Sequence, residues 1–341
     1  MNRAVAHGLI PGSITDVPGI EAGHHTLSGR PTGCTVVLCE QGAVAAVDVR
    51  GGAPGSRETA LLDPANLVER IHAVVLSGGS AYGLDSAGGV MRWLESRGIG
   101  FPIGSDAGML GRVPIVCGAV LMDLGVGDFS LRPDIEAGWR ACEAAGPEAL
   151  PEGNLGAGAG ATVGKLFGAQ WAMKGGFGGS SWRFAEQGWT LGVAVAVNAV
   201  GDVRDPRDNR LIAGARDLHG LRDSQAAMFG VAPNGGVPGG NTTIGVVATD
   251  APLSRGQAGR LAQMAQDGYA RAISPIHTPF DGDTLFALST APPGSGEVSA
   301  RELTALGSVA ATLVAHAIAR AVLAAEGLPE YGLPAARDLP A

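Results

Sequence analysis

The pattern of hydrophobic and polar positions along the chain changes repeatedly between that of buried strands and that of amphipathic helices. Residues 34–52 predict two short strands, and a helix is expected from about Pro64. Residues 72–80 predict a buried strand that ends in a glycine turn. Residues 81–98 show helical spacing and stop at Gly98, a residue type that commonly ends a helix. Strands and helices are therefore interleaved from the start.

The middle of the chain predicts a further helix, two loops and a strand. Residues 135–145 have helical spacing, whereas the glycine-rich stretches 153–168 and 174–183 are typical of loops. Residues 189–203 form an apolar run that predicts a buried strand, and the polar residue Asn198 lies near its end.

The last third of the chain adds two strands and two helices. Residues 242–249 predict a strand, and Ser254 is a suitable N-cap for the helix that follows it. A strand over 283–290 and a long, alanine-rich helix over about 299–325 complete the pattern. Strands accompanied by long apolar helices predict sheets covered by helices on their outer faces, within a single domain over residues 1–341.

Composition narrows the class of protein. The chain is 45% hydrophobic and 16% charged, which indicates a compact globule rather than a disordered chain. Its net charge is −8, and no run of Lys or Arg could follow a phosphate backbone, so nucleic acid and anionic membranes are poor partners. The first 20 residues contain no continuous apolar segment, and His316 and Arg320 interrupt the apolar run 309–325. We therefore expect a cytoplasmic protein with no signal peptide and no membrane span.

The cysteines and histidines predict no metal site and no disulfide framework. Without an export signal the cysteines are expected as reduced core thiols, and their spacing is unlike a zinc pattern; they are Cys34, Cys39, Cys117 and Cys142. The histidines form no HExxH motif. No cofactor is expected.

Glycine-rich segments suggest a nucleotide site only weakly. Residues 156–161 fit G-x-G-x-x-A but follow no clear strand, and the overlapping phosphate-loop pattern fails at Ala159 and Leu166. A nucleotide-binding protein is a remote alternative. Lys165 is one of only two lysines, the other being Lys174, and it is either a buried ammonium with a task or an ordinary loop residue.

A pair of carboxylates and a glycine loop are the other candidate features. Asp281 and Asp283 are two residues apart at the start of a strand, so both side chains face the same side and repel each other. Either a reaction uses this pair or Asp281 belongs to an ordinary Asp-Gly turn.

The glycine loop raises the possibility of chain cleavage. Four glycines within 235–240 precede Asn241, Thr242 and Thr243, and the loop is either a hinge or a place where the chain breaks. A Thr hydroxyl becomes a good nucleophile once cleavage frees its own amine, whose pKa of about 7.7–8.0 suits a base.

The ordered motifs resemble a known family. "ITDVPGIEAGHHT", "HAVVLSGGSAYGLDSAGG", "GAGAGATVGK", "VAVNAVGDV", "GGNTTIGVVATDAPLS" and "DGDTLFALST" are similar to segments of the self-processing N-terminal-nucleophile hydrolases. That family includes D-aminopeptidase/esterases, β-peptidyl aminopeptidases and the nylon-oligomer hydrolase. The resemblance implies an αββα sandwich, autocleavage between Asn241 and Thr242 into residues 1–241 and 242–341, and a homo-oligomer, a tetramer of cleaved pairs.

The resemblance also implies roles for single residues. Thr242 would be the nucleophile, Asn198 would supply an oxyanion or positioning contact, and Lys165 would lie in the site. Tyr82 would place a hydroxyl near the reacting carbonyl, and the two aspartates, Asp281 and Asp283, would orient the nucleophile and its amine. The implied activity is hydrolysis of short peptides or peptide-like oligoamides, with acyl transfer through the same Thr ester as the alternative.

One departure concerns the substrate. The aminopeptidase branch generally carries Ser at the nucleophile position and a Ser/Glu arrangement in place of the two aspartates. The Asn241–Thr242 junction and the pair Asp281 and Asp283 look more like the nylon-oligomer branch. The mechanism is unaffected, because Thr and Ser do the same chemistry.

Overall fold

A computed structural model describes residues 8–105, 108–230 and 240–339. In this part of the chain, nine strands form one continuous hydrogen-bonded sheet, in the order β10-β11-β16-β18-β2-β4-β7-β3, with β1 paired to β2. Their bounds are β1 (Glu21–Thr26), β2 (Gly33–Val49), β3 (Ser56–Arg57), β4 (Arg70–Ser77), β7 (Val116–Val120), β10 (Gly176–Arg183), β11 (Thr190–Asn198), β16 (Thr242–Thr249) and β18 (Thr284–Ser289).

Strand β2 connects two layers of this sheet. Its first half pairs with β1 and β4, whereas residues 44–49 pair with β18. The register with β4 shifts between Leu38 and Ala43, and this irregularity divides the two halves of the strand. One layer therefore contains β1, β4, β7 and β3, and the other contains β18, β16, β11 and β10.

Three separate hydrophobic clusters show that the layers are stacked. Val74 of β4 and Val246 of β16 belong to one cluster, which fills the space between the two layers. The alternate residue Val75 packs with the helices α2 (Ser86–Ser96) and α3 (Ile135–Glu143). Val247 packs on the other side with α5 (Arg255–Ala272) and α6 (Ala300–Ala324). Both faces of both layers are thus buried.

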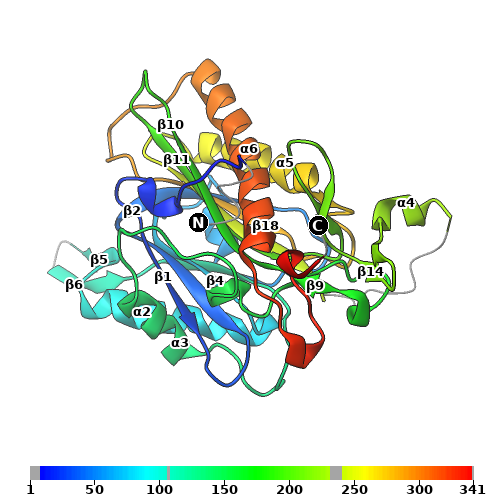
Figure 1. The fold of residues 1–341 in the computed structure, drawn as a ribbon. Coiled ribbons are helices and arrows are strands. Elements are labelled where there is room, and N and C mark those ends of the chain that lie inside the picture. Colours follow the sequence, from blue (N-terminus) through cyan, green and yellow to red (C-terminus); the bar gives the residue numbers. More distant parts are fainter. Residues whose placement is uncertain (1–7, 106–107, 231–239, 340–341) are drawn as a thin grey trace.

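The resulting architecture is helix, sheet, sheet, helix. Figure 1 shows α5 and α6 on one side of the strands and α2 and α3 on the other. This confirms the expected αββα fold in a single domain. The cleavage expected between Asn241 and Thr242 stays a prediction.

The smaller elements connect these layers. The described chain also holds α4 (Ser224–Met228) and the 3₁₀ turns η1 (Ile14–Asp16), η2 (Thr59–Leu62), η3 (Ser80–Asp85), η4 (Gly156–Gly158), η5 (Ala169–Trp171), η6 (Pro329–Tyr331) and η7 (Ala336–Asp338). Its short strands are β5 (Phe101–Ser105), β6 (Gly108–Val113), β8 (Thr162–Val163), β9 (Met173–Lys174), β12 (Asp202–Arg204), β13 (Leu211–Ala213), β14 (Arg216–Asp217), β15 (Gly220–Leu221) and β17 (Ile273–Ser274).

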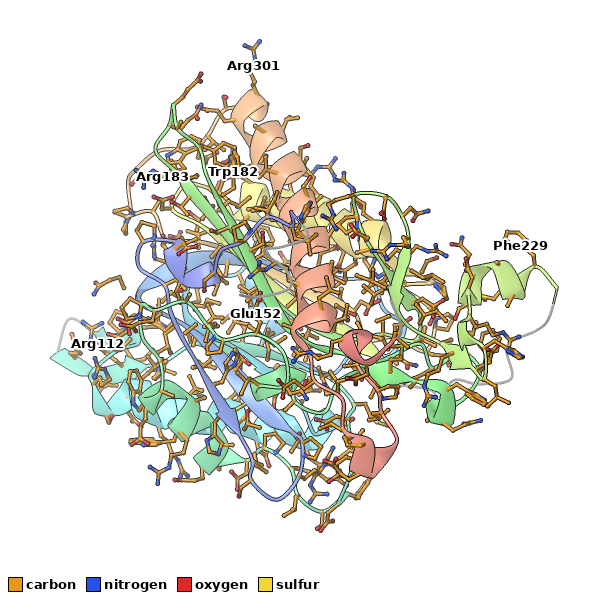
Figure 2. All side chains as sticks on the ribbon, viewed as in Figure 1. Arg112, Glu152, Trp182, Arg183, Phe229 and Arg301 are labelled. Carbon is orange, nitrogen blue, oxygen red and sulfur yellow. The ribbon has the colours of Figure 1, made fainter. Side chains whose placement is uncertain are left out.

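Helix α6 is long and apolar enough to cross a membrane by length and composition alone, but most of it is buried inside the protein. Its one buried arginine, Arg320, pairs with Glu152 at 2.9 Å, and Figure 2 shows Glu152 beside the lower half of the helix. Burial of this kind is the behaviour of a core helix.

Three local predictions were wrong. The helix expected from Pro64 is absent from the described residues 63–69, because Asp63 accepts a hydrogen bond from the backbone of Ala65 at 2.8 Å in a local turn. The two strands expected in 34–52 are the single strand β2. The stretch expected as a loop over 174–183 is mostly strand β10, whose glycines allow close packing: a Cβ on Gly178 would lie 2.3 Å from the backbone oxygen of Ala317 in α6.

Candidate active site

The candidate site lies at one end of two neighbouring central strands, β11 and β16. Asn198, the last residue of β11, is directly opposite Thr242, the first residue of β16, in the antiparallel register. Both residues are buried. Both faces of these strands are apolar, so the register is fixed by the pairing seen in the structure rather than by the apolar pattern alone.

The Thr242 hydroxyl is directed at the carbonyl before it. Its Oγ1 donates to the backbone oxygen of Asn241, and the backbone N–H of Gly282 donates to the same oxygen at 3.0 Å. Asn241 also forms a parallel bridge with Asp281, which brings the start of β18 alongside the junction. The carbonyl of Asn241 is therefore held between a hydroxyl and a backbone donor.

Lys165 connects this junction to Asn198. Its Nζ donates to Asn198 Oδ1 at 2.9 Å, to the Asn198 backbone oxygen at 3.1 Å and to the Gly240 oxygen at 3.2 Å. Burial lowers the pKa of Lys165 to about 7, and nearby carboxylates, that of Asp281 foremost, partly oppose the shift. Lys165 is thus a half-buried amine whose Nζ is hydrogen-bonded to both sides of the junction, which favours the first of its two expected interpretations.

The Asn198 amide has partners on both its oxygen and its nitrogen. Oδ1 accepts from Lys165 and from the backbone of Thr162 at 2.9 Å, and Nδ2 donates to the backbone oxygen of Met122 at 3.1 Å. The oxygen and one N–H of the amide thus hold the residue in place, and the second N–H of Nδ2 is still available for the oxyanion contact, so the structure fits both expected roles.

The two aspartates both face the junction but differ in their partners. Asp281 Oδ2 accepts from the backbone and hydroxyl of Thr278 at 2.9 and 2.6 Å, whereas its Oδ1 is buried and has no partner among the described residues. Burial, reinforced by the charge of Asp283, raises the pKa of Asp281 to about 6. Asp283 Oδ1 accepts from the backbone N–H of Thr243 at 2.7 Å.

Tyr82 lies apart from this group. It is 52% exposed on the turn η3, with the ring of Phe129 at 6.5 Å in an edge-on arrangement and the guanidinium of Arg132 3.9 Å from its own ring centre. These contacts do not connect it to Thr242, so the role that the resemblance implied for its hydroxyl stays a prediction. Of the glycine loop, Gly235, Gly236 and Gly239 lie outside the described residues.

The glycine-rich segment 156–161 has a packing role. It is buried, and its 3₁₀ turn opens no α-helix whose N-terminus could receive a phosphate. A Cβ on Gly158 would lie 2.3 Å from the backbone nitrogen of Phe177, and one on Gly160 would lie 2.3 Å from the Pro31 oxygen. Close backbone packing therefore explains these glycines.

Sequence reasoning missed two residues near the site. Asp123 accepts from Arg30 and Thr32, each at 2.6 Å, and from the backbone of Gly79 at 2.9 Å, in a network where Arg30 and Asp123 are fully buried. His277 donates to Asp283 from both its backbone and its ring. Neither residue has a recognisable motif around it, although a charged residue in an apolar segment was a possible signal for Asp123.

A cavity of about 580 Å³ adjoins the junction. Gly240, Asn241 and Lys165 line it together with apolar side chains that include Met122 and Leu333. Such a volume suits a small organic ligand. Among the described residues, no group of three or more His, Cys, Asp or Glu side chains could hold a metal ion.

The four stacked layers have the Ntn hydrolase fold, and the family model and the relatives make the chain an amide-bond hydrolase. The chain belongs to Peptidase family S58, whose family model matches residues 12–332.

Relatives and solved structures agree with this assignment. An uncharacterized aminopeptidase of Mycobacterium tuberculosis is 44% identical, over 96% of this chain and 97% of the relative. A 6-aminohexanoate-oligomer endohydrolase of Kocuria sp. is 32% identical, over 90% of this chain and 84% of the relative. The structure of the L-aminopeptidase D-Ala-esterase/amidase of Ochrobactrum anthropi, described as a variant of the Ntn hydrolase fold, matches with a TM-score of 0.68 and 22% identity, over 95% and 90% of the two chains. A Burkholderia sp. β-aminopeptidase matches with a TM-score of 0.66 and 22% identity, over 95% and 92%.

Proposed function

We propose that this hydrolase acts on short peptides or peptide-like oligoamides through Thr242, which becomes its nucleophile when the chain cleaves itself after Asn241. The observation that carries the proposal is the Asn241 carbonyl, which accepts from both Thr242 Oγ1 and the Gly282 N–H. A nucleophile and an oxyanion donor are thus assembled around one peptide bond.

Self-cleavage then requires no outside group except water. Thr242 Oγ1 attacks the carbonyl carbon of Asn241, and the oxygen of that carbonyl takes the negative charge next to the Gly282 N–H. The C–N bond breaks, the nitrogen of Thr242 takes up the hydroxyl proton, and an ester joins Asn241 to Oγ1. Water hydrolyses this ester and leaves a carboxylate on Asn241 and a free amine on Thr242.

Turnover of a substrate repeats both steps of this sequence, attack by Oγ1 and hydrolysis of the ester. The free amine of Thr242 removes the hydroxyl proton, Oγ1 attacks the substrate carbonyl, and the departing amine takes the proton. Water then hydrolyses the ester. Lys165 and Asn198 hold the strand end, and the unpartnered Oδ1 of Asp281 is available to the new ammonium of Thr242.

The cavity is the acyl side of the proposed substrate site. The ester formed in self-cleavage and the ester formed with substrate have the same connectivity at Thr242, so the acyl group occupies the same space in both. In the uncut chain Gly240 and Asn241 lie there. Asp123 and Lys165, the charged residues of that lining among the described residues, are already engaged with protein partners, which favours an uncharged acyl chain.

The test is replacement of the nucleophile. Thr242→Ala should remain one chain without activity, and Thr242→Ser should retain some self-cleavage and some hydrolysis, because the hydroxyl survives. Denaturing mass spectrometry should find chains 1–241 and 242–341 in the wild type. A fully active, intact single chain would overturn both the nucleophile and its free-amine base.

A further inference from the structure

The carboxylate of Asp283 is held by three N–H groups from two segments. Oδ1 accepts from the backbone of Thr243 at 2.7 Å, and Oδ2 accepts from the backbone and from ring Nδ1 of His277, each at 3.0 Å. Asp283 is fully buried, and the ring of His277 is 18% exposed. The carboxylate thus joins the segment before β18 to the second residue of β16.

His277 has an unusual backbone conformation for its residue type. Its φ is 57°, in the left-handed region that residues other than glycine seldom occupy. Its Nε2 is buried and has no partner among the described residues, and its ring lies 6.2 Å from that of Tyr269. A conformation of this kind persists only where surrounding contacts enforce it, and such positions cluster at functional sites.

The two contacts to Asp283 account for this conformation. A left-handed residue can direct its own N–H and its ring nitrogen at the same carboxylate oxygen, as His277 does. The Nδ1 contact places the ring proton on Nδ1. The side chain therefore fixes one oxygen of Asp283 and leaves the other directed at the N–H next to the nucleophile.

We propose that His277 is a positioning residue for the nucleophile, acting through Asp283 on the backbone of Thr243 and so on the orientation of Thr242. The inference rests on the proposed role of Thr242. His277 does not line the cavity next to the junction. Its loss should therefore lower kcat and the rate of self-cleavage, while KM stays nearly constant, because substrate contacts are unchanged.

Two substitutions separate the ring from the backbone. His277→Gly suits the left-handed conformation and keeps the backbone N–H but removes the ring donor. His277→Asn also tolerates this conformation and offers an amide N–H in place of Nδ1. His219→Ala, at an exposed position, is the matched control. We expect kcat and the self-cleavage rate of the Gly variant to fall roughly tenfold to a hundredfold, the scale of a misplaced reacting group.

The Asn variant decides between positioning and mere packing. We expect it to recover most of the lost kcat, with melting temperatures of both variants close to that of the control. A Gly variant with kcat within threefold of the wild type, or an Asn variant no better than Gly, would overturn the inference. If the Gly variant does not fold, His277→Asp replaces it, since Asp tolerates the same backbone conformation but has no N–H in its side chain. Equal kcat values for the Asn and Asp variants would then overturn the inference. Thr242→Ala keeps the two proposals distinct, because an active Thr242→Ala would refute the nucleophile itself.

Discussion

Gly282 donates its backbone N–H to the carbonyl oxygen of Asn241 at 3.0 Å, across the narrow gap between the start of β16 and the segment before β18. Gly282 also has no room for a side chain, since a Cβ there would lie 2.8 Å from Thr242 Oγ1. The same residue thus supplies a donor to the carbonyl and leaves space for the hydroxyl that would attack it in the proposed self-cleavage. This explains why the residue between the two aspartates is a glycine.

Gly282→Ala should slow self-cleavage by roughly tenfold or more, because the new methyl group displaces the hydroxyl from its line of attack. A modest fall in melting temperature should accompany it, since the backbone oxygen of Ala53 would also lie 2.8 Å from the methyl group. The cut fraction is followed against time on denaturing gels. Gly111→Ala is the control, because nothing lies within 4 Å of a Cβ there. Cleavage at the wild-type rate in Gly282→Ala would contradict the proposed geometry of attack.

Asp281→Asn and Asp283→Asn should each lower turnover by roughly a hundredfold, with secondary structure retained. Asp281 has a buried oxygen free for the Thr242 ammonium, and Asp283 holds the N–H of Thr243 at 2.7 Å. The competing interpretation of Asp281 as a turn residue predicts a lower melting temperature and near-normal kcat. Both quantities are measured on the same samples, and normal turnover in both variants would remove the aspartates from the site.

The sequence predicted the parts of this site that depend on regular strands. The apolar runs predict two buried strands, with Asn198 near the end of one and Thr242 at the start of the other, and the structure adds the register that places these two residues opposite each other. The spacing of Asp281 and Asp283 likewise predicts that both lie together where β18 begins, and the structure places them in the segment just before this strand. Strands that are apolar on both faces also predict sheets covered by helices, whereas the stacking of two sheets in four layers was implied by the family resemblance.

The parts that could not be predicted depend on contacts between distant segments. Asp123 pairs with Arg30, 93 residues away, and no spacing rule connects them. His277 is marked only by its backbone conformation, which the sequence does not disclose. The glycines of β10 predict a loop, because glycine usually interrupts strands. In the structure these glycines let the strand approach α6 closely.

Stability should rise between about pH 7 and pH 9. Burial lowers the pKa of Lys165 and Lys174 to about 7, so over this range the unfolded chain binds more protons at these groups than the folded chain does. Each lysine contributes up to about 1.4 kcal/mol per pH unit to the free energy of unfolding. Urea titrations of Thr242→Ala, a chain expected to stay uncut, measure the slope. Adding Lys174→Met should reduce it, and an unchanged slope would contradict the lysine assignment.

The free energy of unfolding should fall again above about pH 9. Burial raises the pKa of Cys39, Cys117 and Cys142 to about 12 in the folded protein, so their thiols ionise only in the unfolded chain and stability falls as the pH rises. Adding Cys142→Ala to the same uncut chain should weaken the decline between pH 9 and pH 11. A decline of equal steepness without this thiol would show that other groups cause it.

Blocking the free amine of a short substrate should change kcat/KM by less than about tenfold, equivalent to about 1.4 kcal/mol. In the cavity lining, Asp123 already accepts from Arg30 and Thr32, so it offers no unpaired charge to a substrate ammonium. Recognition of a charged amine by a buried, otherwise unpaired carboxylate would give a much larger difference. The measurement compares aminohexanoate trimer and a tripeptide amide with their N-acetylated forms, and Thr242→Ala supplies the background rate. Loss of more than a hundredfold on acetylation in both series would contradict this expectation, because it would show that the acyl side requires a free amine.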